Sequence, residues 1–193
     1  MEIIKQLGKI TLNYNISIDS KIINKDKDQQ TSIINWIKQK TNKNMVKFEK
    51  MFTMSINGDS SKDFHNFCDN KGPTLTIIKT TKNKIFGGFT PLNWENRGGN
   101  KYDEKNQTFI FSLNLMKKYD MIDNEREAIY CAGEYGPIFG SSDFQIETNM
   151  KKGTTYANKF TNFLSNNNLE LTGGKGNDET FDIEDMEVFK VIY

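Results

Sequence analysis

The residues of this chain best suited to covalent chemistry are one histidine and two cysteines. His65 and Cys68 are three positions apart, so on a helix they share a face and can touch. Such a pair could supply a thiol nucleophile and its base, with Cys131 as the resolving thiol of a thiol-based peroxide scavenger. The neighbours of Cys68 are apolar, however, and we favour a buried thiol that packs as a small hydrophobic side chain.

Four carboxylates near the C-terminus offer a second kind of chemistry. In an extended strand Asp182 and Glu184 share one face, and Asp185 and Glu187 share the other. Two carboxylates on one face could flank a glycosidic bond, as in a carboxylate-based hydrolase. We favour the alternative, in which the charged residues form the beginning of a strand and protect a sheet edge from unwanted pairing.

Metal and phosphate motifs are incomplete in this sequence. Asn24, Asp26 and Asp28 imitate the start of an EF-hand loop, but the positions of its glycine and its bidentate glutamate hold other residues. The segment Gly173–Gly176 contains a lysine, yet glycine follows it where a phosphate loop needs Ser or Thr. We therefore expect no metal site and no cofactor.

The charge balance excludes several classes of protein. The 193 residues include 26 Lys and Arg against 25 Asp and Glu, a net charge of +1, and the pI is about 7.6. Nucleic-acid-binding proteins usually carry a basic stripe and a higher pI, so we expect no nucleic-acid partner. Two cysteines define no disulfide framework and no apolar run reaches transmembrane length, so we expect a reduced, cytoplasmic protein without membrane insertion.

Short apolar segments with a period of two predominate among the elements that must position these residues. Strands are expected at residues 1–18, 52–56, 74–79, 85–90, 108–113, 128–132, 144–147 and 186–193, with a polar loop at 93–107. The Asn57-Gly58 turn ends the second of these strands. Paired glycines inside the fourth, Gly87 and Gly88, are typical of a close approach of backbones.

Helical spacing is limited to three segments. Helices are expected at residues 32–40 and 156–164 and after Ser60, which forms a capping box with Asp63. The buried face of the capped helix should consist of Phe64, Phe67 and Cys68.

The absence of a regular alternation of strands and helices predicts the fold class. We expect an α+β, mainly β fold: a sandwich of two largely antiparallel sheets with short flanking helices. Its core should include Leu75, Ile77, Phe86, Phe89, Phe109, Phe111, Val188 and Val191.

Six short motifs follow one another along the chain: Lys71–Leu75 (KGPTL), Phe86–Phe89 (FGGF), Pro91–Trp94 (PLNW), Phe109–Leu113 (FIFSL), Gly136–Gly140 (GPIFG) and Glu187–Val191 (EVFKV). In this order they resemble the TLDc domain family over about Phe48 to Tyr193. The resemblance implies the same sandwich. We therefore expect an N-terminal strand and helix extension, residues 1–47, packed on a TLDc-like domain, residues 48–193.

The resemblance also implies a function. TLDc proteins are associated with protection against oxidative stress and with binding of the vacuolar proton-pumping ATPase, whose assembly they modulate. The expectation for this chain is a non-enzymatic intracellular interaction module that binds the peripheral sector of that ATPase. Two enzyme alternatives stay open: a peroxide scavenger using Cys68, and a hydrolase using Glu184 and Glu187, the latter matching the glutamate of the family's closing motif.

Exposed anchors rimmed by polar groups are typical of interaction surfaces. Two turns fit this description and contain the candidate partner-binding residues Asn57, Asp59, Trp94, Asn96 and Arg97. For Trp94 an alternative stays open, in which the indole folds back and covers the sheet.

Overall fold

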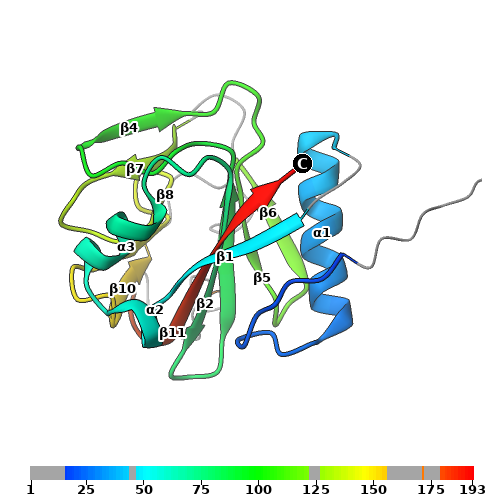
Figure 1. Ribbon diagram of the computed structural model, residues 1–193, viewed down its shortest axis with the longest axis horizontal. Coiled ribbons are helices and arrows are strands. Elements are labelled where there is room, and N and C mark those ends of the chain that lie inside the picture. The colour runs from blue at the N-terminus through cyan, green and yellow to red at the C-terminus, as the bar shows by residue number, and fades with distance from the viewer. Residues whose placement is uncertain (1–15, 44–46, 122–126, 156–170, 172–178) are drawn as a thin grey trace, which may run out of the picture.

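The computed structural model of the chain describes residues 16–43, 47–121, 127–155, 171 and 179–193 (Figure 1). Its helices are α1 (Lys27–Thr41), α2 (Met54–Asn57) and α3 (Ser61–Cys68). Its strands are β1 (Lys47–Thr53), β2 (Thr74–Thr80), β3 (Ile85–Thr90), β4 (Gly99–Tyr102), β5 (Phe109–Ser112), β6 (Lys117–Asp120), β7 (Glu127–Cys131), β8 (Ile138–Phe139), β9 (Phe144–Ile146), β10 (Lys152–Thr155) and β11 (Glu179–Ile192).

Two antiparallel sheets share the long strand β11. The first sheet has the order β1-β11-β2-β3-β5-β6, and the second has the order β4-β7-β8-β9-β10-β11. The second sheet uses the beginning of β11, where Asp182 pairs with Lys152, and the first uses the remainder. All pairings among the described strands are antiparallel, so the predicted mainly β sandwich with short flanking helices is confirmed.

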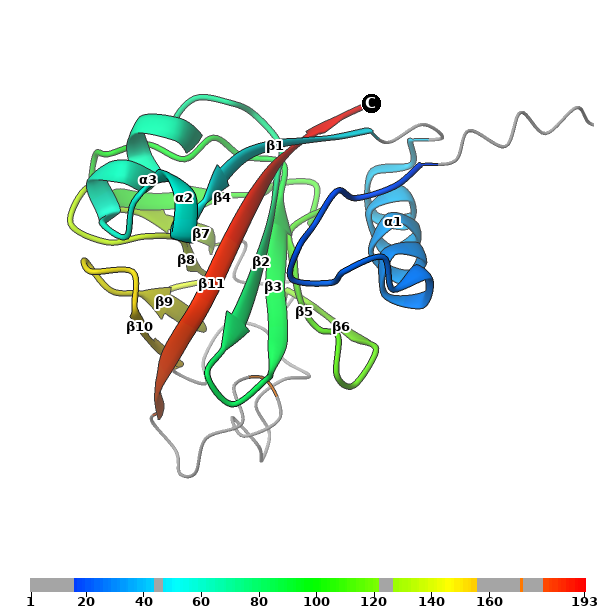
Figure 2. The same cartoon turned by 60° about the horizontal axis from the view of Figure 1, so that its bottom comes forward.

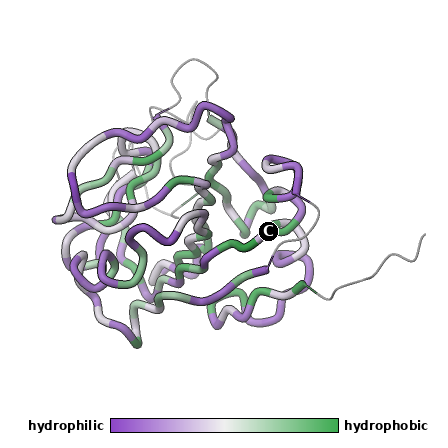
Figure 3. Tube along the Cα trace, turned by 45° about the horizontal axis from the view of Figure 1, so that its top comes forward, coloured by the Kyte–Doolittle hydropathy of each residue, from purple (hydrophilic) through white to green (hydrophobic). Residues whose placement is uncertain are grey.

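Both faces of the first sheet are covered (Figure 2). Between the sheets, the Phe144 ring centroid lies 5.4 Å from that of Phe86 and 4.9 Å from that of Phe139. On the opposite face, Ile33 and Ile37 of α1 are fully buried in a second cluster of apolar side chains. Apolar segments accordingly gather along the inner strands, while polar ones follow the periphery (Figure 3).

The core prediction holds for every residue that it named. At most 2% of each is exposed: Leu75, Ile77, Phe86, Phe89, Phe109, Phe111, Val188 and Val191. Because β3 is covered on both faces, all its residues after Ile85 are buried. Such a strand lacks the alternation of a one-sided sheet and appears in the sequence as a nearly continuous apolar run.

Helix α1 begins earlier than the predicted residue 32, because Asp26 caps it. The Asp26 carboxylate accepts hydrogen bonds from the N–H groups of Asp28 and Gln29, at 3.1 and 3.0 Å. The EF-hand-like residues therefore form a helix N-terminus. Asn42, in the left-handed conformation at φ 55°, ends the helix.

The strand predicted to reach Ile56 ends at Thr53, and the prediction is wrong in its second half. The side chain of Asn57 accepts a hydrogen bond from the Thr53 N–H at 2.7 Å, which closes the short helix α2. Met54 stays buried, but Ile56 is 65% exposed. The local capping interaction thus overrides the period of two in the sequence.

The capping box of α3 is confirmed, but one of its three predicted core residues is not. Ser60 and Asp63 cap each other's backbone N–H groups. Phe64 and Cys68 are fully buried, whereas Phe67 is 39% exposed and His65 takes its place in the interior. The prediction of Phe67 as a core residue is therefore wrong.

The prediction missed the strands that form the borders of the sheets. β4 and β6 end the two sheets and read GNKY and KKYD, without apolar alternation. Edge strands are often polar because one side faces water and charges discourage further pairing. The short strands β8 and β10 were also missed, and β11 begins at Glu179 instead of the predicted Met186.

Some expectations lie outside the described residues. They are the part of the first predicted strand before Ile16, the helix at 156–164 and the glycine-rich segment Gly173–Gly176. The described end of that first segment, residues 16–18, forms no strand, so this part of the prediction is wrong. Among the described helices, none has the length and apolar character needed to span a membrane.

Candidate functional site

His65 is held in the interior by three oxygen atoms. Its Nδ1 lies 2.7 Å from the Asp69 carboxylate, and its Nε2 lies 3.1 Å from the carbonyl oxygens of both Ala132 and Tyr135. Both ring nitrogens are thus occupied. The Nε2 contacts fix α3 to the segment after β7, whereas the Nδ1 contact stays at the C-terminal end of α3. The structure does not place His65 as a base for Cys68.

Both thiols are buried and unpaired. Burial raises the pKa of Cys68 far above its ordinary value, and the Asp69 carboxylate adds to this effect. Burial also raises the pKa of Cys131, whose Sγ lies 3.9 Å from the carbonyl oxygen of Asn93. Reaction with peroxide requires an accessible thiolate, so neither environment suits a scavenger.

The raised pKa of Cys68 predicts a loss of stability in alkali. The thiol of the unfolded chain ionises near pH 9.0, whereas the folded protein keeps Cys68 protonated. Its contribution is therefore complete below pH 9 and declines above it, by about 1.4 kcal/mol per pH unit. Urea denaturation between pH 8 and 10.5 should show a flatter dependence for Cys68→Ala than for the wild type. Equal slopes would contradict a buried, protonated thiol.

The four C-terminal carboxylates do not converge on a cleft. Glu184 pairs with Lys79 at 2.7 Å, while Asp185 accepts hydrogen bonds from the Ser55 N–H and hydroxyl at 3.0 and 2.7 Å. A bulge between Ile183 and Asp185 breaks the expected alternation of faces. β11 pairs with β10 at Asp182 and with both β1 and β2 at Glu187, so these two carboxylates do not protect a free sheet edge.

Glu187 is fully buried and binds the N-terminal segment to the sheet. Its Oε1 accepts hydrogen bonds from Lys50 Nζ at 2.8 Å and from the Lys21 N–H at 3.1 Å. Its Oε2 accepts the Ser20 hydroxyl, which itself accepts the Ile23 N–H at 3.2 Å. A carboxylate with these partners has a structural task. Sequence reasoning singled out Glu187 but could not find its distant partner Ser20.

Trp94 adopts the folded-back alternative and is not an exposed anchor. It is 1% exposed, and its Nε1 donates a hydrogen bond to Thr74 Oγ1 at 2.9 Å. Its ring centroid lies 5.7 Å from that of Phe64 and 5.5 Å from that of Phe139. The indole therefore joins α3 to both sheets.

The other four partner-binding candidates lie at opposite ends of α3. Asn57 and Asp59 precede the helix, whereas the Asn70 N–H at its other end donates to the Trp94 carbonyl, just before Asn96 and Arg97. Its 8 residues separate the two groups by about 12 Å. Asp59, Asn96 and Arg97 are exposed, and Asn57 is half-buried.

Asp59 also borders a cavity of about 640 Å³, lined mainly by residues with polar side chains, beside the turn between β9 and β10. Lys151 Nζ lies 2.5 Å from its carboxylate, and this hydrogen bond lowers the pKa of Asp59. Glu147, on the cavity wall, accepts hydrogen bonds from Thr154 and Gln145 at 3.3 Å. Within the described residues, no group of three or more His, Cys, Asp or Glu side chains is arranged to hold a metal ion.

Comparisons with known proteins identify one family. A family model described as TLDc domain matches residues 16–192, so the match extends the motif resemblance into the N-terminal segment. TBC1 domain family member 24 of Xenopus tropicalis is 25% identical over 126 residues, which is 63% of this chain and 22% of that protein. MTOR-associated protein MEAK7 is 32% identical over 63 residues in Danio rerio (33% of this chain, 14% of that protein) and 33% identical over 67 residues in Gallus gallus (35% and 14%). The chain thus spans less than a quarter of these relatives.

Proposed function

Because this chain belongs to the TLDc domain family, we propose that it is a non-enzymatic interaction module of the cytoplasm. Its partner in this proposal is the peripheral sector of the vacuolar proton-pumping ATPase, whose assembly it modulates as part of protection against oxidative stress. Family membership is the observation that carries the proposal.

The positions of the reactive side chains support an interaction module over the two enzyme alternatives. A scavenger would act through Cys68, which is buried with a raised pKa. A hydrolase would act through Glu184 and Glu187, but one pairs with Lys79 at the surface and the other holds the N-terminal segment. These arrangements give the three side chains structural roles.

We further propose that the partner contacts the exposed groups at the two ends of α3, Asp59, Asn96 and Arg97, with Asn57 beside them. Loops and helix ends on a rigid scaffold commonly carry binding residues. The buried Trp94 supplies that rigidity, because it fixes α3 to the sheets.

Charge reversal tests this surface. The double variant Asp59→Lys and Arg97→Glu keeps the net charge and should melt at nearly the wild-type temperature. Its affinity for the immobilised peripheral sector should fall about tenfold, because both charges become repulsive. The matched control, Asp19→Lys with Lys82→Glu, exchanges two other exposed charges and should bind normally. Undiminished binding by the folded double variant would exclude this surface, and no binding by the wild type would exclude the partner.

A further inference from the structure

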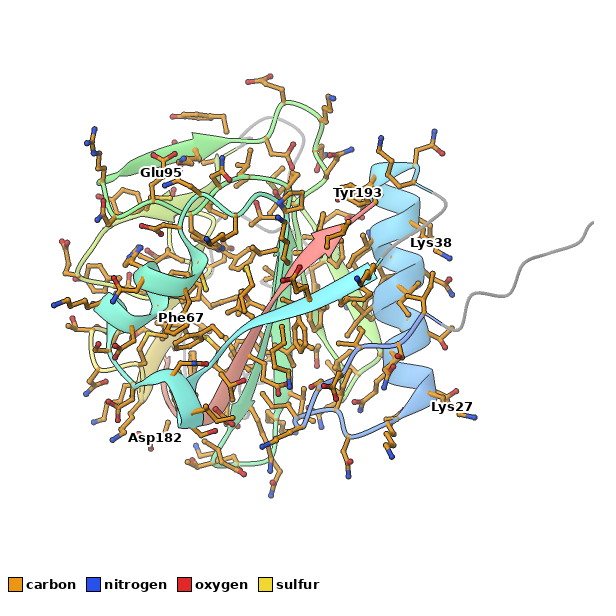
Figure 4. All side chains as sticks on the ribbon, in the orientation of Figure 1. Lys27, Lys38, Phe67, Glu95, Asp182 and Tyr193 are labelled. Carbon is orange, nitrogen blue, oxygen red and sulfur yellow. The ribbon has the colours of Figure 1, made fainter. Side chains whose placement is uncertain are left out.

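A groove of about 340 Å³ lies between β1 and α3 and is lined by residues of both elements. Its lining includes the half-buried Met51 and the 39% exposed Phe67. The Phe67 ring centroid is 6.1 Å from that of the buried Phe52, so the exposed ring is supported by the core. Figure 4 labels Phe67, which lies between α3 and β1. An aromatic ring held in this way is a suitable anchor for an apolar side chain.

The edge of β1 that faces away from β11 is open in the described part of the chain. The Val191 N–H donates to the Pro73 carbonyl at 2.8 Å, away from β1. Phe48 lies opposite Val191, so in an antiparallel ladder the backbone N–H and C=O of Phe48 point away from β11. The backbone N–H and C=O of Lys50, two residues further along β1, also point away from β11. No backbone hydrogen bond joins this edge to another residue in the described part of the chain.

The surroundings of the groove are basic. Lys71 and Lys190 line it, and Glu49 is the acidic residue in its lining. Lys47 shares the strand face of Glu49, and Lys62 shares the helix face of Asn66, which also lines the groove. Within the described residues, none of the four lysines forms an ion pair, unlike Lys50, which binds Glu187.

From these features we infer that the β1–α3 groove binds an extended, acidic segment of a partner protein. The segment adds a strand to the open edge of β1, places an apolar side chain against Phe67 and Met51, and directs carboxylates toward Lys71 and Lys190. The inference rests on the proposed interaction function and specifies the chemistry of the partner. The groove shares no residue with the surface at the ends of α3.

An extended peptide suits the groove better than other occupants. A lipid headgroup could use the lysines but not the unpaired backbone groups of β1. The segments of this chain outside the described residues carry no net charge when taken together. They therefore lack the acidic character that four unpaired lysines favour.

Fluorescence anisotropy of the full chain with a labelled short peptide, in which glutamate alternates with leucine, tests the inference. The wild type should bind it, and a peptide with lysine in place of glutamate should not bind. Lys71→Glu with Lys190→Glu should weaken binding about tenfold or more, because attraction becomes repulsion. The control is Lys82→Glu, on the turn between β2 and β3. It should bind the peptide like the wild type and melt at the wild-type temperature.

Two results would overturn the inference that the groove binds an acidic segment. One is no binding of the acidic peptide by the wild type, and the other is equal binding by the folded variant Lys71→Glu with Lys190→Glu. Stronger binding to phosphatidylserine vesicles than to the peptide would assign the lysines to a membrane surface and also overturn it. Retention on the immobilised ATPase peripheral sector separates the two proposals. If the wild type binds the peptide but not the peripheral sector, the inferred groove is supported and the ATPase is excluded as its partner. If Lys71→Glu with Lys190→Glu still binds the peripheral sector but no longer binds the peptide, the ATPase uses another surface.

Discussion

Gly87→Ala is expected to destabilise the protein by about 3 kcal/mol, at the upper end of the usual cost of overpacking. A Cβ atom on Gly87 would lie 1.9 Å from the Thr76 carbonyl oxygen and 2.9 Å from the Phe111 ring. The first obstacle is backbone of the central strand β2, which cannot move without breaking its pairing. The free energy of unfolding, measured with urea, should therefore fall sharply.

Gly98→Ala is the matched control for this substitution. The nearest atoms to its added Cβ lie at 3.7 Å, which is ordinary van der Waals contact. Its effect should stay within about 0.5 kcal/mol, as for most surface changes. An equal denaturation midpoint for Gly87→Ala and the wild type would contradict the pairing of β2 with β3.

Glu187→Ala is expected to cost about 3 kcal/mol, because it removes one partner of a buried, hydrogen-bonded ion pair. Lys50, the Ser20 hydroxyl and the Lys21 N–H all lose their acceptor. This loss of stability is in the lower part of the usual range for breaking a buried ion pair, since the Lys50 side chain is 26% exposed and can reach water. Limited proteolysis should also cleave near Ser20 faster than in the wild type.

Glu184→Ala on the same strand provides the comparison. Its carboxylate pairs with Lys79 but is 48% exposed, so its loss should change stability by less than about 0.5 kcal/mol. If the two variants were equally stable, Glu187 would not hold the N-terminal segment, and its burial would need another explanation.

The strongly apolar parts of the fold were predictable from the sequence. The Phe-rich strands β3 and β5 occur as predicted because covering both faces demands continuous apolar residues. The capping box of α3 was predictable for a different reason, since its partners are neighbours along the chain. Local signals of these two kinds need no knowledge of tertiary structure.

The remaining features depend on side-chain contacts that the apolar pattern does not encode, either within a turn or between distant segments. Ile56 ends in solvent because the Asn57 side chain turns the chain, and Phe67 is exposed because His65 instead points inward to the carbonyls of Ala132 and Tyr135. The clamp between Ser20 and Glu187 joins residues far apart in the chain. The periodicity of apolar residues carries no information on such pairs. Candidate residues could therefore be chosen from the sequence, but their contacts with one another could not be predicted.

Burial of Trp94 has the clearest consequence for function. Because Trp94 is buried, it cannot act as a surface anchor. The docking surfaces that we propose are therefore the charged and amide groups at the ends of α3 and the β1–α3 groove with its lysines. Both flank α3, which His65 and Trp94 fix to the sheets.

Release of the ATPase peripheral sector from vacuolar membrane vesicles tests the proposed function most directly. Purified protein is added to vesicles that carry the assembled enzyme, and the peripheral sector in the supernatant is measured after sedimentation. Our account predicts that the released fraction changes with increasing protein concentration and that the folded double variant Asp59→Lys with Arg97→Glu has a weaker effect. A released fraction that stays constant at saturating concentrations of the folded wild type would contradict it.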